Sequence, residues 1–325
     1  MAIKTFALIG AAGYVAPRHV RAVKETGNVL LAAIDPHDNM GFLDNYYPET
    51  RFFTKFERFD RYIDKLKNEN KGVDFVSICS PNHLHNTHIK SALHWSADAI
   101  CEKPLVLNPL NLNVLKKIEE ESGQRVWNVL QLRYHPRIVS LKKKIEAAAP
   151  DKSFEIDLTY VTSRGLWYYT SWKGQEEKSG GIATNIGVHF FDMLLWIFGS
   201  VKENLVHLHA HDRATGYLEF EKARVRWFLS INNELLPNKV KANGKTTFRS
   251  MVIDGEDFDF SDGFIDLHTT VYEDIIAGGG FGIEDIRGAI EIAHSVRTQT
   301  PLGLKGEYHP LAKRELSMHP FNNKQ

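Results

Sequence analysis

Apolar and polar positions alternate along roughly the first hundred residues in a strand-then-helix order. Short apolar runs, typical of strands buried on both faces, occur at 5–10, 28–35, 73–80 and 97–104. The stretches between them carry apolar residues three or four positions apart, which predicts amphipathic helices at 17–27, 61–70 and 82–95. This order predicts a parallel sheet with helices on both faces.

The pattern changes near Ser153. Longer alternating runs predict strands of an open, mainly antiparallel sheet at 154–163 and 222–232. Two helical stretches separated by glycines then close the sequence, at 268–279 and 282–297. The second part of the chain is therefore expected to form a different kind of α/β domain from the first.

The change of pattern predicts two domains, 1–127 and 128–325. The 40 basic and 40 acidic residues cancel, which argues against a broad cationic surface for nucleic acid or acidic lipid. Cys79 and Cys101 both end apolar runs and are expected to be buried thiols in a reducing compartment. We find no apolar run of membrane-spanning length and no secretory signal, so we expect a cytoplasmic protein.

The first apolar run ends in a turn of small residues, "GAAGYVAPRHV", with Gly10 and Gly13 in a G-x-x-G spacing. Small residues let the backbone approach a pyrophosphate, whose charge is then met by amides at the helix N-terminus. About twenty residues further on, Asp35 can accept hydrogen bonds from both adenosine ribose hydroxyls and would repel a 2′-phosphate. The turn and Asp35 predict a Rossmann domain that binds NAD in preference to NADP.

Three further motifs, "SPNHLHNTH", "CEKPLVLN" and "SGGIATNIGVHFFDMLLWIFG", indicate a family. They resemble the glucose-fructose oxidoreductase, inositol dehydrogenase and MocA family of NAD(P)-dependent sugar oxidoreductases, and the resemblance covers nearly the whole chain. It implies an N-terminal Rossmann domain and a C-terminal α/β domain whose open sheet often forms the oligomer interface. Within the family, "GAAGYVAPRHVRAVK", "RGLWYYTSWKG" and "NIGVHFFDMLLW" are most similar to the UDP-N-acetyl-2-amino-2-deoxyglucuronate 3-dehydrogenase type.

The E-K-P motif supplies the first candidate catalytic residue. Lys103 matches the family lysine that lies between nicotinamide and sugar. Its ammonium would stabilise the alkoxide character that develops as hydride leaves the carbon. The resemblance also implies a cis peptide bond before Pro104, which X-Pro bonds allow at modest cost. Without the motif, a solvated lysine at a strand end would be the simpler interpretation.

His189 is the second candidate catalytic residue, since it matches the family histidine that contacts the reacting hydroxyl. Imidazole can remove that proton near neutral pH. Asn185 lies four residues earlier and is expected on the same helix face. Many relatives carry aspartate there, and a neutral amide can position a sugar oxygen but cannot stabilise imidazolium by charge. Which of Lys103 and His189 accepts the proton stays open.

The segment 163–174, "SRGLWYYTSWKG", is the candidate for substrate choice. Its aromatic and cationic side chains can stack on a sugar or base and pair with carboxylate or phosphate. The expected substrate contacts are Arg164, Tyr168, Trp172, Lys173, Asn185, His189 and Lys103. Arg164 is the leading anion partner. The alternative interpretation is a sheet edge packed with aromatics that ends in a polar loop.

The turn and the resemblance together assign the cofactor contacts. These are Gly10, Ala11, Ala12, Gly13, Tyr14, Asp35, Ser80, Pro81, Asn82, His85, Glu102, Lys103 and Gln131. The histidines of "NHLHNTH" also invite a metal interpretation. However, no carboxylate or cysteine nearby completes a convincing ligand set, and hydride transfer needs no metal. We therefore expect no metal.

The resemblance implies an NAD-dependent oxidation of the C3 hydroxyl of UDP-linked N-acetylglucosaminuronic acid (UDP-GlcNAcA) in lipopolysaccharide sugar biosynthesis. In some enzymes of this type the bound NADH is reoxidised by 2-oxoglutarate, which is a candidate co-substrate here. The family implies homo-oligomers, and a tetramer is favoured. Two alternatives stay open: a dehydrogenase of a free sugar or cyclitol, and a non-catalytic NAD-responsive binding protein. The joint presence of Lys103 and His189 counts against the binding protein.

Overall fold

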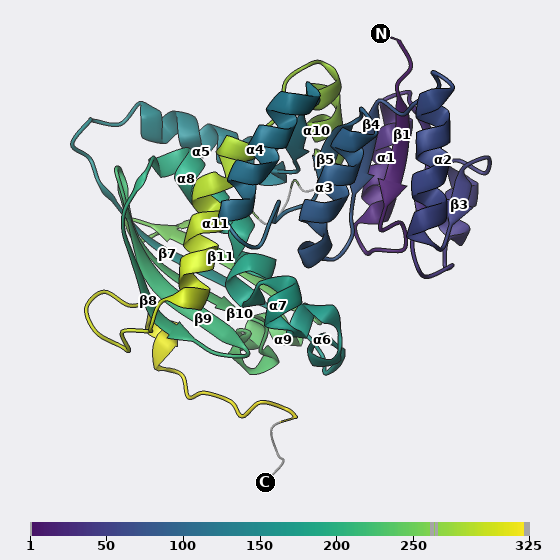
Figure 1. Cartoon of the computed structure of the whole chain (residues 1–325). Helices are drawn as coiled ribbons and strands as arrows, with labels where there is room; N and C mark the ends of the chain where they lie inside the picture. Colours follow the sequence, from purple (N-terminus) through teal and green to yellow (C-terminus); the bar gives the residue numbers. More distant parts are fainter. Residues whose placement is uncertain (1, 261–262, 264–265, 322–325) are drawn as a thin grey trace. The chain divides into compact units, whose positions relative to one another are not determined.

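The computed structural model describes residues 2–260, 263 and 266–321 (Figure 1). These residues form two compact units. The first contains 2–134 and 266–287, and the second contains 135–260, 263 and 288–321. Each unit has its own six-stranded sheet with helices, which confirms the predicted pair of α/β domains.

The sheet of the first unit is parallel throughout, with strand order β3-β2-β1-β4-β5-β6. Its strands are β1 (Thr5–Ile9), β2 (Val29–Ile34), β3 (Arg51–Phe53), β4 (Phe75–Ile78), β5 (Asp98–Cys101) and β6 (Val126–Asn128). β1, β2, β4 and β5 are the four strands that the apolar runs predict. The strand order reverses between β1 and β4, and open α/β sheets bind their ligands outside the carboxyl ends of the strands at such a point.

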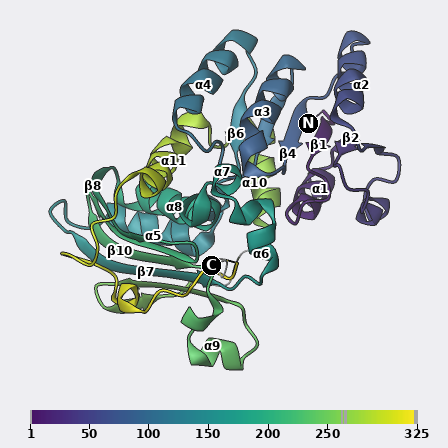
Figure 2. The ribbon, with the colours of Figure 1, turned by 60° about the horizontal axis from the view of Figure 1, so that its bottom comes forward.

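Helices cover both faces of this sheet (Figure 2). They are α1 (Ala16–Glu25), α2 (Phe56–Asn68), α3 (His85–His94), α4 (Leu110–Ser122) and α10 (Leu267–Ile276). α1 and α10 pack against each other on one face. The right-handed rule for crossovers between parallel strands puts α2, α3 and α4 on the other face. There α3 contacts α4, and the rings of Phe59 and Trp95 lie 5.6 Å apart at their centroids.

The first unit extends beyond the 1–127 that we expected, and it is not continuous in sequence. Residues 128–134 stay with it because the Tyr134 hydroxyl donates to Asp274 at 2.7 Å, close to the end of α10. α10 itself contributes the fully buried ring of Tyr272 to the core of this unit. The sequence pattern of α10 shows that it is a helix but does not show which sheet it covers.

The sheet of the second unit has the order β12-β11-β7-β10-β9-β8. Its strands are β7 (Phe154–Thr162), β8 (Val201–His209), β9 (Arg213–Phe220), β10 (Ala223–Ser230), β11 (Thr247–Ile253) and β12 (Glu256–Phe258). β7 and β10 are parallel, and the other neighbouring pairs are antiparallel. The expectation of a mainly antiparallel sheet is therefore confirmed.

Alternating residues of β7 face opposite sides of this sheet. Tyr160 faces α8 (Val188–Phe198), and its ring centroid lies 4.8 Å from that of Phe190. Thr159 faces the other side, where its hydroxyl lies 3.0 Å from Nε2 of His309. Figure 2 shows α5 and α8 over one face and the C-terminal segment, in yellow, across the other. In the described part of the chain, the remaining α-helices are α5 (Pro136–Glu146), α6 (Trp167–Thr170), α7 (Glu176–Ser179), α9 (Asn238–Ala242) and α11 (Ile283–Thr298), and short 3₁₀ and π turns occur as well.

One stretch, Glu176–Phe198, is long and apolar enough by length and composition to cross a membrane, although we expected none. It includes α8, whose side chains pack inside the second unit. Because 72% of its most apolar window is buried within the fold, its hydropathy is accounted for by its place in the core.

Candidate functional site

The first unit brings the expected cofactor residues to one edge of its sheet. The turn of residues 10–13 follows β1, and Asp35 follows β2. Ser80 and Lys103 follow β4 and β5, and Gln131 begins the short 3₁₀ turn η3 (Gln131–Tyr134) after β6. These are the carboxyl ends of parallel strands, at which Rossmann domains bind dinucleotides.

The turn after β1 depends on glycine. Gly10 has a φ of +83°, and a Cβ built there would lie 2.5 Å from the backbone nitrogen of Ser80. A Cβ at Gly13 would lie 3.0 Å from the Gly10 carbonyl oxygen. The amides of Gly10 and Ala11 donate to the Ile34 carbonyl at 2.9 and 3.1 Å. The turn therefore lies tightly against the ends of β2 and β4, where a side chain at Gly10 would collide with the backbone of Cys79 and Ser80.

Asp35 is buried and supports this turn. Its Oδ2 accepts the Ala12 amide at 3.0 Å, and its Oδ1 accepts the His37 amide at 2.9 Å. Each carboxylate oxygen has a further lone pair, so Asp35 can still accept ribose hydroxyls. Tyr14, next to the turn, has a largely exposed side chain, and the guanidinium carbon of Arg18 lies 5.5 Å from its ring centroid. The turn and Asp35 fit the adenosine and pyrophosphate parts of NAD.

His85 begins α3, after Pro81 and the 3₁₀ turn η2 (Asn82–Leu84). The side chain is 1% exposed, with Nδ1 2.7 Å from the Pro104 carbonyl oxygen and Nε2 2.8 Å from the Ser80 carbonyl oxygen. Burial lowers the pKa of His85, although the bonds to both carbonyls oppose this. We expected His85 to line the nicotinamide side, and here its ring lies between the Ser80 carbonyl, after β4, and the Pro104 carbonyl, after β5. A neutral ring donates to one of these two carbonyls.

The other two histidines of this motif have separate surroundings. His83 is exposed, whereas His88 is buried with Nδ1 2.8 Å from the Ser80 hydroxyl and its ring stacked on Phe56. Burial lowers the pKa of His88 to about 4. Among the described residues, these three histidines do not form a cluster of metal-ligating atoms.

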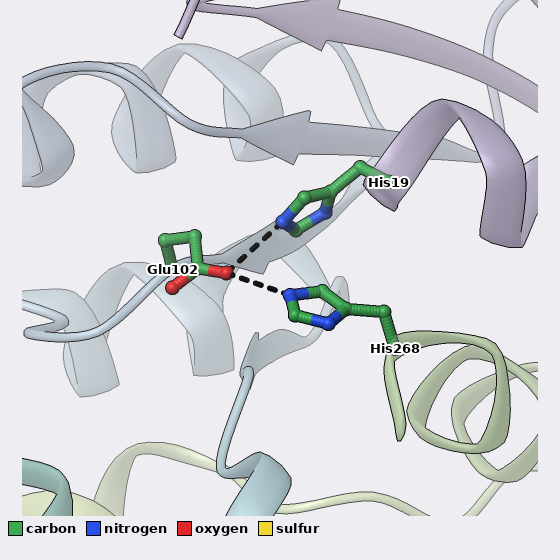
Figure 3. A group of neighbouring side chains, drawn as sticks. All are labelled: His19, Glu102 and His268. Atoms are coloured by element: carbon green, nitrogen blue, oxygen red, sulfur yellow. Dashed lines mark hydrogen bonds and ion pairs between the residues drawn. The ribbon is translucent and has the colours of Figure 1, made fainter. Parts of the chain in front are cut away.

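Glu102, directly after β5, lies between two histidines that the sequence analysis did not single out (Figure 3). Its Oε1 is 3.1 Å from Nε2 of His19, on α1, and 3.1 Å from Nε2 of His268, on α10. All three side chains are buried. Its Oε2 accepts the backbone N–H of Lys103 at 3.2 Å. Glu102 thus links α1 and α10 to the end of β5, next to Lys103.

The hydrogen bonds continue from His19 to Tyr272 and Ser77. The Tyr272 hydroxyl lies 2.7 Å from Nδ1 of His19 and 2.6 Å from the Ser77 hydroxyl. Burial lowers the pKa of His19. Burial opposes ionisation of Glu102, but the hydrogen bonds from His19 and His268 hold its pKa well below the usual value. A neutral His19 that donates to a charged Glu102 must accept at Nδ1, so Tyr272 donates to it and Ser77 donates to Tyr272.

Lys103 is half-buried, and its peptide bond to Pro104 is cis, as the resemblance implies. Cys79 and Cys101, at the ends of neighbouring apolar runs, are buried and free. Burial raises the pKa of both thiols well above its usual value. The expectation of buried, unpaired cysteines is confirmed.

In the second unit, the expected helix around His189 contains two geometries. Asn185 lies in a π-helical turn, η5 (Ala183–Gly187), and His189 lies in α8. The Asn185 side-chain amide donates to the Tyr168 hydroxyl at 3.3 Å. The half-buried His189 ring has its centroid 6.3 Å from that of Tyr160. We expected one regular α-helix, and a π-helical turn of this kind occurs frequently at functional sites.

The segment 163–174 begins after the end of β7 and contains two short helical turns but no strand, so the alternative of a sheet edge is wrong. It contains α6 and the 3₁₀ turn η4 (Trp172–Gly174). Half-buried Arg164 precedes these turns, and its backbone N–H donates to the Ile231 carbonyl at 3.0 Å. The Nζ of Lys173 lies 5.6 Å from the ring centroids of both Trp167 and Trp172. Cationic and aromatic groups therefore lie side by side in this segment.

Two of the expected substrate residues, Tyr168 and Lys173, line a cavity of about 130 Å³ in the second unit. His209, His211 and His319 also line it. A larger cavity of about 380 Å³ lies between α5 and the β11–β12 hairpin and contains none of the expected substrate residues. The smaller cavity is therefore the better candidate for part of the substrate site, because Tyr168 and Lys173 line it.

The sequence analysis missed His19, His268 and Tyr272. His19 lies within the helix after the glycine turn, where a histidine on an apolar face is usually a core residue. His268 and Tyr272 lie near the other end of the sequence, and only the fold brings them to Glu102. No spacing in the sequence relates these residues to the E-K-P motif.

A parallel sheet with a glycine turn after β1 and a carboxylate after β2 defines an NAD-binding Rossmann domain, here joined to an α/β unit with an open sheet. Comparison with known families agrees with this class. Residues 4–129 match the Gfo/Idh/MocA oxidoreductase family, NAD-binding Rossmann fold, and residues 152–244 match its C-terminal alpha/beta domain. The chain belongs to this family of NAD-binding oxidoreductases, which confirms the resemblance seen in its motifs.

Solved structures similar to the chain include the WlbA (WbpB) dehydrogenase of Thermus thermophilus. In complex with NAD and alpha-ketoglutarate, that protein is 48% identical with a TM-score of 0.91, over 94% of this chain and 99% of its own. In complex with NAD and UDP-GlcNAcA it is 47% identical with a TM-score of 0.91, over 95% and 100% of the two chains. The WlbA dehydrogenase of Bordetella pertussis is 18% identical with a TM-score of 0.74, over 91% of this chain and 94% of its own, and shows the shared fold.

Curated relatives match over shorter stretches. The putative oxidoreductase YteT of Bacillus subtilis is 27% identical over 49% of this chain and 37% of its own length. The D-glucoside 3-dehydrogenase of Escherichia coli is 22% identical over 43% and 40% of the two chains. The chain thus matches less than half the length of these two proteins.

Proposed function

We propose that this chain is an NAD-dependent dehydrogenase that oxidises the C3 hydroxyl of UDP-GlcNAcA. The observation that carries this proposal is the 47% identity, over 95% of the chain, to a Thermus thermophilus dehydrogenase crystallised with NAD and UDP-GlcNAcA. The sequence motifs that contain Lys103 and His189 supply the two groups that the chemistry requires.

Lys103 and His189 have different roles at the reacting hydroxyl. His189 takes the hydroxyl proton, for which a half-buried imidazole is suited near neutral pH. The Lys103 ammonium stabilises the negative charge that develops on the oxygen. Asn185, one turn before His189, positions a sugar oxygen by hydrogen bonding. Because an amide carries no charge, it does not stabilise the imidazolium that forms.

The turn at 10–13 and Asp35 hold the adenosine and pyrophosphate of NAD, and the nicotinamide supplies the hydride acceptor. Asp35 binds the ribose hydroxyls and excludes a 2′-phosphate by charge repulsion. The remaining expected contacts follow β4, β5 and β6 at the same edge of the sheet: Ser80, Pro81, Asn82, Glu102 and Gln131. NAD preference is therefore built into the end of β2.

Arg164, Tyr168, Trp172 and Lys173 bind the nucleotide and the anionic groups of the substrate. A UDP-linked uronic acid offers a diphosphate, a carboxylate and a nucleobase, which match guanidinium, ammonium and aromatic partners. The side-by-side arrangement of Lys173 with Trp167 and Trp172 supports this assignment.

We extend the proposal to the setting of the reaction. 2-Oxoglutarate reoxidises NADH, a role supported by the similar structure that contains NAD and alpha-ketoglutarate. The product is an intermediate for lipopolysaccharide sugars, made in the cytoplasm by a homotetramer.

A substrate screen tests the proposal. UDP-GlcNAcA, UDP-GlcNAc, glucose and inositol would each be tested in two ways. Without 2-oxoglutarate, absorbance follows the formation of reduced cofactor. With 2-oxoglutarate, which consumes NADH, turnover is measured as formation of its reduced form, 2-hydroxyglutarate. We expect turnover with UDP-GlcNAcA and little with the free sugars. Turnover of a free sugar or inositol alone would contradict the nucleotide-sugar assignment, and NAD binding without any turnover would favour a binding protein.

An Arg164→Ala variant tests the substrate contacts in the same assay. A lost charge-assisted hydrogen bond should raise the KM for UDP-GlcNAcA by about tenfold or more. Arg58→Ala, at an exposed position of α2, is the matched control. If Arg164 served only the fold, the variant would be less stable and would keep the same order of substrates.

A further inference from the structure

Buried histidines hold the backbone on both sides of Lys103. We propose that His19, His85 and His268 are positioning residues, which fix the end of β5 and thereby place the Lys103 ammonium. This inference rests on the proposed function, because it takes Lys103 to act in the reaction. It adds three residues to the reaction that neither touch the reacting atoms nor belong to the E-K-P motif.

On the N-terminal side of Lys103, the histidines act through Glu102. One carboxylate oxygen of Glu102 faces Nε2 of both His19 and His268 at 3.1 Å, and the other accepts the Lys103 amide at 3.2 Å (Figure 3). The carboxylate is therefore held by two helices and in turn holds the peptide that enters Lys103. A buried carboxylate with donors on both oxygens has little freedom to turn.

On the C-terminal side of Lys103, His85 acts directly on the backbone. Its Nδ1 lies 2.7 Å from the Pro104 carbonyl oxygen and its Nε2 lies 2.8 Å from the Ser80 carbonyl oxygen. The ring is thus packed between the chain after β4 and the chain after β5, and its one N–H donates to one of the two carbonyls. Together with Glu102, it leaves Lys103 between two fixed peptide units.

The bond to Glu102 sets the tautomer of His19. A charged carboxylate accepts, so the proton of neutral His19 is on Nε2, and Nδ1 accepts from Tyr272, which accepts in turn from Ser77. Placement of this kind matters because a displacement of about 1 Å in a reacting group can lower the rate about a hundredfold.

A metal is the competing interpretation of the same cluster. Two imidazole nitrogens and a carboxylate oxygen lie within 4.8 Å of one another, and these are ligand types for zinc. The hydrogen-bonded arrangement already gives both nitrogens of His19 a partner and places a donor against each oxygen of Glu102. The cluster is thus complete as a hydrogen-bond network, with the proton on Nε2 where a metal would need a lone pair.

A matched pair of variants at His268 tests the proposal. His268→Leu removes the donor to Glu102, whereas His268→Gln can place an amide N–H near the position of Nε2. We expect His268→Leu to lower kcat at least about tenfold and to change the Kd for NAD less than about twofold. We expect His268→Gln to recover most of the lost kcat.

Phe59→Leu, in the core of the same unit on α2, controls for lost stability. It should lower the melting temperature and leave kcat unchanged below that temperature. A His268→Leu protein that is folded and keeps the full kcat would overturn the proposal. So would a stoichiometric metal in the purified wild type that His268→Leu removes.

Nitrogen-15 NMR of histidine-labelled protein tests the network without any sugar. The proposal predicts a neutral His19 with the proton on Nε2, and a His268→Leu spectrum in which the His19 signal shifts. A His19 proton on Nδ1 would overturn the assignment. Wild type that fails to oxidise UDP-GlcNAcA would instead contradict the proposed function, and the NMR result would still decide the network.

Discussion

At the scale of single residues, the proposed chemistry depends on a charge that is in place before substrate binds. Lys103 is half-buried, and its backbone is tied to the buried carboxylate of Glu102. A preorganised charge lowers a barrier because the protein does not reorganise during the reaction. In the proposed reaction, His189, in α8, takes the hydroxyl proton. The two roles predict different effects when either residue is replaced.

Lys103→Met should keep NAD binding and lower kcat by about a hundredfold or more, because it removes the charge that stabilises the alkoxide. Steady-state kinetics and NAD titration provide the measurement. His189→Asn should also slow turnover and abolish the neutral-pH titration of kcat. Lys117→Met, on the exposed face of α4, is the control. Full activity in the Lys103 or His189 variant would refute the role of that residue.

Asp35→Ser should weaken NAD binding and improve NADP relative to NAD. The change removes a ribose acceptor and a charge that repels a 2′-phosphate at the same time. Loss of the Ala12 and His37 bonds also loosens the turn, so the ratio of the two kcat/KM values is the measurement. Asp64→Ser, on α2, removes the same charge elsewhere in the unit and is the control that should keep the wild-type ratio. An unchanged ratio of kcat/KM for NADP and NAD in Asp35→Ser would contradict the assignment.

At the scale of elements, the sequence predicts the strands and turns that carry the site. The apolar runs predict β1, β2, β4 and β5, and their ends carry Gly10, Asp35 and Lys103. Local spacing is enough for this, because each residue lies one or two positions after the end of its own strand. The π-helical turn at Asn185 was not predicted, since a π turn has the same residue types as the helix around it.

Gly10→Ala tests the turn as an element. The φ of +83° and the 2.5 Å approach of a Cβ to the Ser80 nitrogen should lower the free energy of unfolding by about 1–3 kcal/mol. We also expect the Kd for NAD to rise at least about tenfold. Gly41→Ala, whose Cβ would meet no atom within 4 Å, is the matched control. Equal stability and NAD affinity in both variants would show that the turn tolerates a side chain.

At the scale of the whole molecule, the order of elements predicted two α/β domains. It did not predict that a segment after the second sheet belongs to the first unit. α10 follows the second sheet in sequence and packs on α1 in the first unit. With it come His268 and Tyr272, which complete the cluster at Glu102. Such contacts depend on a long-range choice of packing partner, which amphipathic periodicity does not specify.

The stability of both units should fall as the pH is lowered from neutral. Burial lowers the pKa of His88, in the first unit, and of His309, in the second, from 6.5 to about 4. Between pH 6.5 and about pH 4, these two histidines bind protons in the unfolded chain but stay neutral in the folded chain. The free energy of unfolding therefore decreases by up to about 1.4 kcal/mol per pH unit for each histidine.

Urea unfolding at pH 7, 6 and 5 measures this dependence. His88→Gln should reduce the slope of the free energy of unfolding against pH by the contribution of about one proton. His94→Gln, at the exposed end of α3, should leave the slope unchanged. Stability that rises as the pH falls from 7 to 5 would contradict the assignment of neutral, buried histidines.

The position of hydride removal is the most direct test of the proposed reaction. UDP-GlcNAcA deuterated at C3 would be incubated with the protein and NAD, and the nucleotides would be analysed by mass spectrometry and proton NMR. We predict that deuterium appears at C4 of the reduced nicotinamide and that the sugar becomes a 3-keto derivative. Reduced cofactor without deuterium, or no reduction of NAD by this sugar under conditions in which the protein binds NAD, would contradict oxidation of UDP-GlcNAcA at C3.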